Sequence, residues 1–174
     1  MTRYIAFLRA INVGGHNVKM DELKKHFESL GFSNVETFIA SGNVIFETSA
    51  KDVPKLEKKI ESKLHEALGY EVATFLRTTV EVADIAKYTP FKTKGEALNV
   101  AFMAETLDEV IVKKLMTFRN EIDDFHVHGR EMYWSCRVKQ SDSKFSNVAF
   151  EKVIGRRATF RGINTIQKIA EKYY

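Results

Sequence analysis

The stretch that decides the fold is residues 3–47, RYIAFLRAINVGGHNVKMDELKKHFESLGFSNVETFIASGNVIFE. Its first part, 3–9, is short and rich in β-branched and aromatic residues, which predicts a strand. The loop 11–19 that follows contains two glycines, which end the strand. The apolar residues after the loop recur at three- and four-residue steps. This spacing predicts an amphipathic helix over 20–30 that ends at Gly31.

The second part of this stretch predicts a hairpin, because strand-like runs over 35–40 and 43–47 are joined by Ser41-Gly42. After this hairpin, a second helical pattern covers 52–69, and a further strand is expected over 71–77. The order is strand, helix, strand, strand, helix, strand. That order is the βαββαβ plait of ferredoxin-like folds.

The same order of elements repeats in the rest of the chain. A short helix over 79–88, opened by the capping pair Thr78 and Glu81, leads into the repeat. The elements expected after it are a strand over 98–104, a helix opened by a capping box at Thr106 and Glu109, a hairpin across Gly129-Arg130, a helix over 145–154, a strand over 157–160 and a last helix capped by Asn164. We therefore predict an α+β fold of two ferredoxin-like (βαββαβ plait) halves with antiparallel sheets and an extra C-terminal helix.

The predicted organisation is an N-terminal plait-like subdomain over 1–78, then a linker helix and a C-terminal plait-like subdomain over 79–174. The chain has 174 residues, of which 44% are hydrophobic, so it can bury a core of ordinary size. Its 9 Gly and 2 Pro leave no stretch that resembles a flexible linker. We expect the two halves to pack as one compact unit.

The composition also points to a compartment. The single cysteine, Cys136, excludes an internal disulfide and a cysteine-based zinc site, which favours a reducing environment. The apolar run at 4–8 is too short for a signal peptide or a membrane helix. We therefore expect a cytoplasmic protein with no membrane partner, and the sequence leaves its oligomeric state open.

Positive charge gathers at the C-terminal end of the chain. Residues 136–174 hold nine Lys or Arg against three acidic residues, although the whole chain has a net charge of only +4. A basic surface that includes Arg156, Arg157 and Arg161 is typical of contact with a polyanion such as nucleic acid. No aromatic residues interleave with these basic residues, so a solvated helical face is the favoured interpretation.

Several motifs along the chain resemble one known family. They are Arg9 to Met20, Leu23, Leu30-Gly-Phe32, Ser41 to Val44, Leu98 to Phe102, Tyr133-Trp134, Arg161 and Asn164-Thr165. The chain resembles the bacterial domain of unknown function numbered sixteen-ninety-seven. The resemblance implies an α+β fold with ferredoxin-like halves, a bacterial source and no established activity, so it supplies no catalytic residues. The sequence departs from the family pattern at Ala10, where glycine is common, and at Phe160, Gly162 and Ile163, where Thr, Asn and Trp are usual.

The histidine pair His126-Val-His128 is the one spacing that suits a metal ion. Counting from the Gly129-Arg130 turn pairs Val127 with Met132 and Phe125 with Trp134, and leaves His126 beside Tyr133 on the other face of the sheet. No third ligand is placed by the sequence, so we expect no metal and no cofactor. The face of Tyr133, Ser135 and Arg137 is predicted to be open, where an aromatic ring and a base offer a weak case for a nucleotide or RNA.

Topology points to a candidate binding site in the N-terminal half. In a βαββαβ plait the end of the first strand and the turn between the second and third strands lie at the same edge of the sheet. This brings together Arg9, Asn12, Gly14, Gly15, Asn17, Ser41, Gly42 and Asn43. Backbone amides at a glycine turn beside a helix N-terminus, together with an arginine, suit a phosphate or carboxylate. The alternative is that these Asn and Gly residues only shape tight turns.

Three functions remain open at this point. The first is a binding module for a small anionic ligand, a nucleotide or a nucleic acid, which performs no chemistry of its own. The second is an enzyme that acts on a small anionic substrate at the same residues. The third is a structural scaffold. The loop motif holds no convincing base or nucleophile, which favours the binding module over the enzyme.

Overall fold

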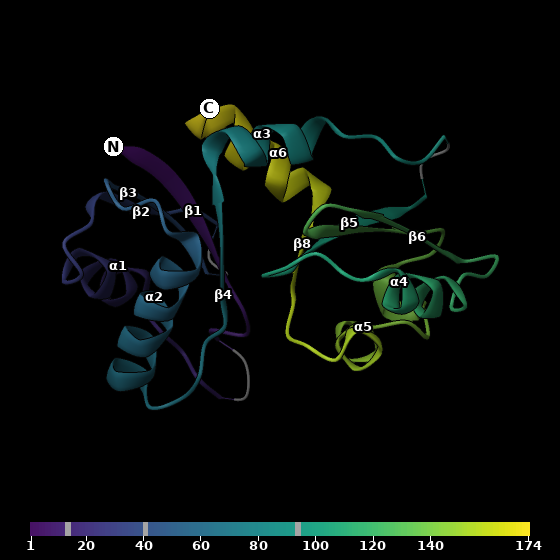
Figure 1. Ribbon diagram of the computed structural model, residues 1–174, viewed down its shortest axis with the longest axis horizontal. Coiled ribbons are helices and arrows are strands. Elements are labelled where there is room, and N and C mark those ends of the chain that lie inside the picture. The colour runs from purple at the N-terminus through teal and green to yellow at the C-terminus, as the bar shows by residue number, and fades with distance from the viewer. Residues whose placement is uncertain (13–14, 40–41, 93–94) are drawn as a thin grey trace. The chain divides into compact units, whose positions relative to one another are not determined.

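The computed structural model describes residues 1–12, 15–39, 42–92 and 95–174. The chain divides into two compact units, one formed by Met1–Ile85 with Lys168–Tyr174 and the other by Ala86–Gln167. Each unit holds one four-stranded antiparallel sheet (Figure 1). The predicted halves are 1–78 and 79–174. The first unit differs from the first half because it also contains most of the linker helix, up to Ile85, and the last residues, Lys168–Tyr174. That the halves pack as one compact unit stays a prediction.

The first unit has the predicted plait. Its elements are β1 (Thr2–Leu8), α1 (Met20–Glu28), β2 (Ser33–Thr37), β3 (Asn43–Thr48), α2 (Val53–Leu68), β4 (Thr74–Thr78) and α3 (Thr79–Lys87). The strand order is β2-β3-β1-β4, with every pair antiparallel. This order places β1 and β3 at the centre of the sheet, as a ferredoxin-like fold requires.

Helices α1 and α2 cover one face of this sheet (Figure 1). Leu23 and Phe27 of α1 and Leu56, Ile60 and Leu64 of α2 lie in one core with alternate residues of the strands. The apolar periodicity of both helices therefore faces the sheet, because burial of that face supplies most of a helix's stability in a protein.

The second unit repeats the plait. Its elements are β5 (Ala97–Phe102), α4 (Glu109–Met116), β6 (Asp123–His128), β7 (Glu131–Cys136), the 3-10 turn η1 (Gln140–Asp142), α5 (Asn147–Ile154) and β8 (Thr159–Gly162). Helix α6 (Ile163–Tyr173) begins in this unit, and its residues from Lys168 onward belong to the first unit. The strand order is β6-β7-β5-β8, which matches the order of the first sheet. Helices α4 and α5 lie on one face, and their apolar residues join Met132 and Trp134 of β7 in the core. The α+β prediction with two ferredoxin-like halves is confirmed.

Several helix ends are set by the predicted residues. Asp52 caps α2 by accepting a hydrogen bond from the Lys55 backbone N–H. At α3 the Glu81 carboxylate accepts from the Thr78 N–H at 2.8 Å, and the Thr78 hydroxyl accepts from the Glu81 N–H at 3.1 Å. This reciprocal pair is the capping box that the sequence predicts, and it satisfies two backbone donors that a helix start leaves open.

Two predicted helix starts are wrong. Helix α4 begins at Glu109 and is capped by Asp108, whose carboxylate accepts from the Ile111 N–H, so Thr106 is not its cap. Helix α6 begins at Ile163, so Asn164 lies within its first turn. At α6 the strand β8 runs directly into the helix, so the residue before the helix is Gly162, which has no side chain to cap it.

Three strands lie a few residues away from their predicted ranges. Strand β8 covers 159–162 instead of 157–160, because its partners on β5 run from Phe102 opposite Thr159 to Asn99 opposite Gly162. Strands β2 and β4 are likewise displaced from 35–40 and 71–77. Pairing with a strand distant in sequence sets these limits, whereas local composition does not show them.

Candidate functional site

The predicted site edge of the first unit is held together by backbone hydrogen bonds. The Leu8 N–H donates to the Gly42 carbonyl at 2.9 Å, which ties the end of β1 to the β2–β3 turn. The Arg9 N–H donates to the Ala73 carbonyl at 2.9 Å. The end of β1 and the hairpin therefore lie at one edge of the sheet, as the topology argument requires. Gly14 and Ser41 lie outside the described residues.

Two of the three asparagines of this edge, Asn12 and Asn43, hold its turns in place. Asn43 is only 2% exposed, and its Nδ2 donates to the carbonyls of Phe38 at 3.1 Å and Ile39 at 3.2 Å. Ile39 has a φ of 52°, a left-handed conformation in which a β-branched residue is strained, so these bonds stabilise an unfavourable turn. Asn12 Oδ1 accepts a hydrogen bond from the Val18 N–H at 2.9 Å and so closes the N-terminal loop.

The rest of the loop lies at the surface. Gly15 and Asn17 are exposed, and Gly15 has a φ of 83°. The His16 ring stacks on Tyr70 with 3.7 Å between ring centroids, and the Tyr70 hydroxyl donates to the Ile11 carbonyl at 2.7 Å. These two contacts hold the loop against the segment that follows α2.

The electrostatics of this edge are mixed. Helix α1 begins at Met20, and the preceding Lys19 gives it no side-chain cap, so backbone N–H groups of the first turn are available to an anion. Asp21 and Glu22 stand in the same turn and oppose an anion there. The cavity between the loop and the hairpin has a volume of about 10 Å³, which is room for about one water molecule. A ligand larger than water must therefore lie on the surface of this edge.

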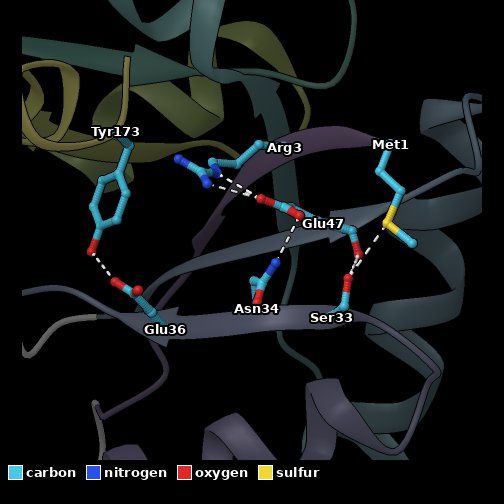
Figure 2. A network of polar contacts seen from close by, with 7 residues as sticks. All are labelled: Met1, Arg3, Ser33, Asn34, Glu36, Glu47 and Tyr173. Carbon is cyan, nitrogen blue, oxygen red and sulfur yellow. Dashed lines mark hydrogen bonds and ion pairs between the residues drawn. The ribbon is translucent and has the colours of Figure 1, made fainter.

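A second polar cluster lies on the sheet of the first unit and was not predicted (Figure 2). The Arg3 guanidinium donates to Glu47 Oε1 at 2.9 and 3.1 Å, and Asn34 Nδ2 donates to Glu47 Oε2 at 2.9 Å. The Asn34 hydrogen bond, followed by those of Arg3, lowers the pKa of Glu47. The network joins β1, β2 and β3 through side chains that lie 13 to 44 residues apart in sequence, which is why no local pattern indicates it.

The C-terminal helix is attached to the same sheet. The Tyr173 hydroxyl donates to Glu36 Oε2 at 2.8 Å, and burial, followed by that carboxylate, raises the pKa of Tyr173 to about 12 (Figure 2). A hollow of about 600 Å³ lies beside this contact, lined by Arg3, Lys24, Asn34 and Glu36 among others. Charges of both signs line it, so it favours neither anions nor cations.

The histidine pair lies where the register argument places it, but its face is not open. His126 is opposite Tyr133, and Val127 is opposite Met132, as predicted. Tyr133 is fully buried and Ser135 is only 8% exposed, so the prediction that this face of the sheet is open is wrong. The reason is Tyr88, after α3, whose hydroxyl lies 2.8 Å from His126 Nε2 and whose ring stacks on His128 at 4.0 Å.

No cluster of three or more His, Cys, Asp and Glu side chains suited to a metal ion is found among the described residues. That the protein is free of metal stays a prediction. Asp123, which precedes the histidines, instead accepts hydrogen bonds from Trp134 Nε1 at 2.8 Å and from the Ser143 hydroxyl. Cys136 is fully buried, and burial raises the pKa of its thiol, so it is a poor nucleophile.

The three C-terminal arginines have different surroundings. Arg156 Nη1 lies 3.9 Å from a carboxylate oxygen of Glu105, and Arg157 is exposed. Arg161 is half-buried and donates to the Thr159 hydroxyl and the Phe160 carbonyl at 2.8 Å, and burial lowers its pKa to about 10. Polyanion binding by this region stays a prediction, with Arg157 the most accessible of the three.

The family model described as "Protein of unknown function (DUF1697)" matches residues 1–133. The fold is similar to the solved structure of a conserved bacterial protein from Streptococcus pneumoniae, with a TM-score of 0.81 and 23% sequence identity over 99% of this chain and 98% of that chain. At this identity the likeness shows the fold alone. No curated protein matches the sequence.

None of the helices in the described parts of the chain has the length and apolar character needed to span a membrane.

Proposed function

The chain belongs to the DUF1697 family of proteins of unknown function, and we propose that it is a binding module for a phosphate-bearing ligand. The proposed site is the edge formed by Arg9, the loop 12–17 and the turn 41–43. The module binds without chemistry of its own. The ligand contacts are the backbone N–H groups of Gly15, His16 and Asn17 and the Arg9 guanidinium, while Asn12 and Asn43 hold the two turns in position.

One observation carries this proposal. Gly15, His16 and Asn17 are exposed and consecutive, and their backbone N–H groups have no hydrogen-bond partner among the described residues. Consecutive free N–H groups around a residue with positive φ form a concave site that attracts anions. The hydrogen bonds of Asn12 and Tyr70 fix the loop before a ligand arrives, which lowers the entropy lost on binding.

The size of the cavity favours binding over catalysis. The 10 Å³ between loop and hairpin cannot enclose a substrate, and catalysis of hydrolytic or transfer reactions benefits from a site that excludes water. Contact with a phosphate alone needs no enclosure, because charge-assisted hydrogen bonds form at a surface. The role proposed here is therefore recognition of an anionic group.

The experiment is a titration of the full chain, labelled with ¹⁵N, with inorganic phosphate and then with adenosine monophosphate at constant ionic strength. We expect saturable shifts of the amide signals of Gly15, His16 and Asn17. Arg9→Ala should weaken binding by at least about tenfold, since a hydrogen bond to a charged group contributes roughly 1.5–3 kcal/mol. The control Arg137→Ala removes the same charge from an exposed position of the second unit and should leave binding unchanged.

Two results would contradict the proposal. One is the absence of saturable shifts in the loop, and the other is a folded Arg9→Ala variant that binds phosphate as tightly as the parent. Asn43→Ala serves as a separate check of the turns. If circular dichroism shows that this variant unfolds while the parent binds no phosphate, these residues only shape the turns.

A further inference from the structure

A hollow of about 540 Å³ lies entirely within the second unit. Its walls come from the end of α3 and the stretch after it, the start of β5, the end of β7, the turn η1, and the junction of β8 with α6. Because β5 runs antiparallel to both β7 and β8, the start of β5 and the ends of those two strands meet at one end of the sheet. We call this space the β5 hollow. Its volume lies within the range of roughly 300–1,000 Å³ that small-molecule sites occupy.

Two polar side chains of the β5 hollow have unused hydrogen-bonding capacity. Asn99 and Ser135 are each only 8% exposed, and neither side chain makes a hydrogen bond to another described residue. Every fully buried side-chain nitrogen or oxygen atom of the described residues does have a partner. The polar atoms of Asn99 and Ser135 therefore remain accessible, and the hollow is the space that they line. Polar groups buried to this degree are normally paired, so this pair indicates a place for a polar ligand.

The described lining of the β5 hollow suits an uncharged ligand better than a phosphate. Glu96 is the only charged side chain among the described residues that line it. The remaining polar groups are neutral, and they include the amides of Asn164 and Gln167 from the first turns of α6. An amide side chain offers both a donor and an acceptor, a combination that matches the edge of a nucleobase.

Aromatic rings form the other part of the wall. Tyr88 and Phe91 are half-buried and line the hollow. Tyr88 is held by its contacts with His126 and His128 and by an edge-on contact with Tyr133, whose ring centroid is 5.3 Å away. A fixed aromatic ring is a surface on which a planar heterocycle can stack, with a contribution of about 1–3 kcal/mol per base.

Gly95 shows how closely the chain passes over Ser135. A Cβ atom at this position would lie 2.6 Å from the Cys136 carbonyl oxygen and 2.8 Å from the Ser135 hydroxyl oxygen. Any side chain at residue 95 would therefore displace this segment and cover the hydroxyl. The glycine keeps the Ser135 hydroxyl available at the wall of the hollow.

We propose that the β5 hollow binds the uncharged base of a nucleoside, with Asn99, Ser135 and Asn164 contacting the edge of the base and Tyr88 or Phe91 contacting its face. This site is separate from the proposed phosphate site, because it uses other residues, in the other unit, and needs no anionic group. The two proposals therefore fail independently.

The experiment is a titration of the ¹⁵N-labelled full chain with adenosine, guanosine, cytidine and uridine, with nicotinamide as a second source of an uncharged planar amide. We expect at least one nucleoside to cause saturable shifts at Ser135 and Asn164 and none at Gly15 or Asn17. Binding of nicotinamide alone would overturn the assignment to a nucleoside. Binding of adenosine monophosphate without binding of adenosine would overturn it too, and would assign that binding to the phosphate.

Variants locate the binding. Ser135→Ala and Asn164→Ala should each weaken nucleoside binding by about tenfold, since each leaves one polar group of the base unpaired. Asn147→Ala is the matched control, because Asn147 is also an exposed asparagine in the first turn of a helix, here α5, and does not line the hollow. Asn164 is exposed, so its variant is expected to fold. Unchanged affinity of folded Asn164→Ala and Ser135→Ala variants, or no nucleoside binding to the parent, would overturn the proposal.

Discussion

Replacement of Asp123 tests its buried polar contact with Trp134 in the second unit. Asp123 is 2% exposed, and its Oδ1 accepts hydrogen bonds from Trp134 Nε1 at 2.8 Å and from the Ser143 hydroxyl at 2.9 Å. Trp134 is fully buried, so water cannot replace the lost acceptor in Asp123→Ala. Ser143 is half-buried and can turn its hydroxyl toward water.

The expected loss of stability follows from these partners. An unpaired buried donor costs about 1–3 kcal/mol, and hydrogen bonds to a charged group contribute about 1.5–3 kcal/mol each. The gain from no longer burying a carboxylate offsets part of that loss. We expect Asp123→Ala to lower the free energy of unfolding by about 2–4 kcal/mol. Asp123→Asn keeps an acceptor for Trp134 and should cost only about 1 kcal/mol.

The assay is guanidinium unfolding followed by the fluorescence of Trp134, which is the single tryptophan of the chain. Asp124→Asn is the matched control, because Asp124 is the neighbouring carboxylate and its side chain is 43% exposed in an ion pair with Arg119. This surface pair should contribute no more than about 1 kcal/mol. An Asp123→Ala variant within about 0.5 kcal/mol of the parent, or an Asp123→Asn variant that is equally destabilised, would refute the reasoning.

Two further changes test the turns and the C-terminal helix. Gly31 and Gly42 have φ angles of 86° and 77°, but a Cβ meets no atom within 4 Å at Gly31, whereas at Gly42 it lies 2.9 Å from Ile11 Cγ2. Gly31→Ala should therefore lower the free energy of unfolding by about 1–2 kcal/mol, and Gly42→Ala should lower it by at least about 1 kcal/mol more. Thermal unfolding measures both variants, and equal losses of stability would contradict the crowding at Gly42. The pKa of Tyr173 is raised from 10.0 to about 12, so the folded protein favours the protonated hydroxyl. The stability that this hydroxyl contributes is therefore fully present below pH 10 and is lost as the pH rises through about 12. Tyr173→Phe should remove this alkaline loss in unfolding measurements across that range, and an unchanged pH profile would argue against the Glu36 contact.

The order of elements and the local contacts were readable from the sequence. The Gly129-Arg130 turn determines the register of its hairpin, because side chains alternate faces from a known turn, and His126 is indeed opposite Tyr133. The capping box joins Thr78 and Glu81, which are only three positions apart, and it is also correct. The edge that joins the end of β1 to the β2–β3 turn follows from connectivity alone.

The partners of each polar side chain are visible only in the tertiary structure. The sequence predicts Asn43 as a ligand contact, yet its side chain is buried and donates to two carbonyls of its own turn. The histidine face looked open, but Tyr88, 38 residues before His126, lies on it. The β5 hollow draws its walls from segments between residues 86 and 167 that are separated along the chain, so no local sequence pattern indicates it. Periodicity and turn chemistry act over a few residues and are therefore visible in sequence, whereas burial and hydrogen-bond partners depend on segments that only the folded chain brings together.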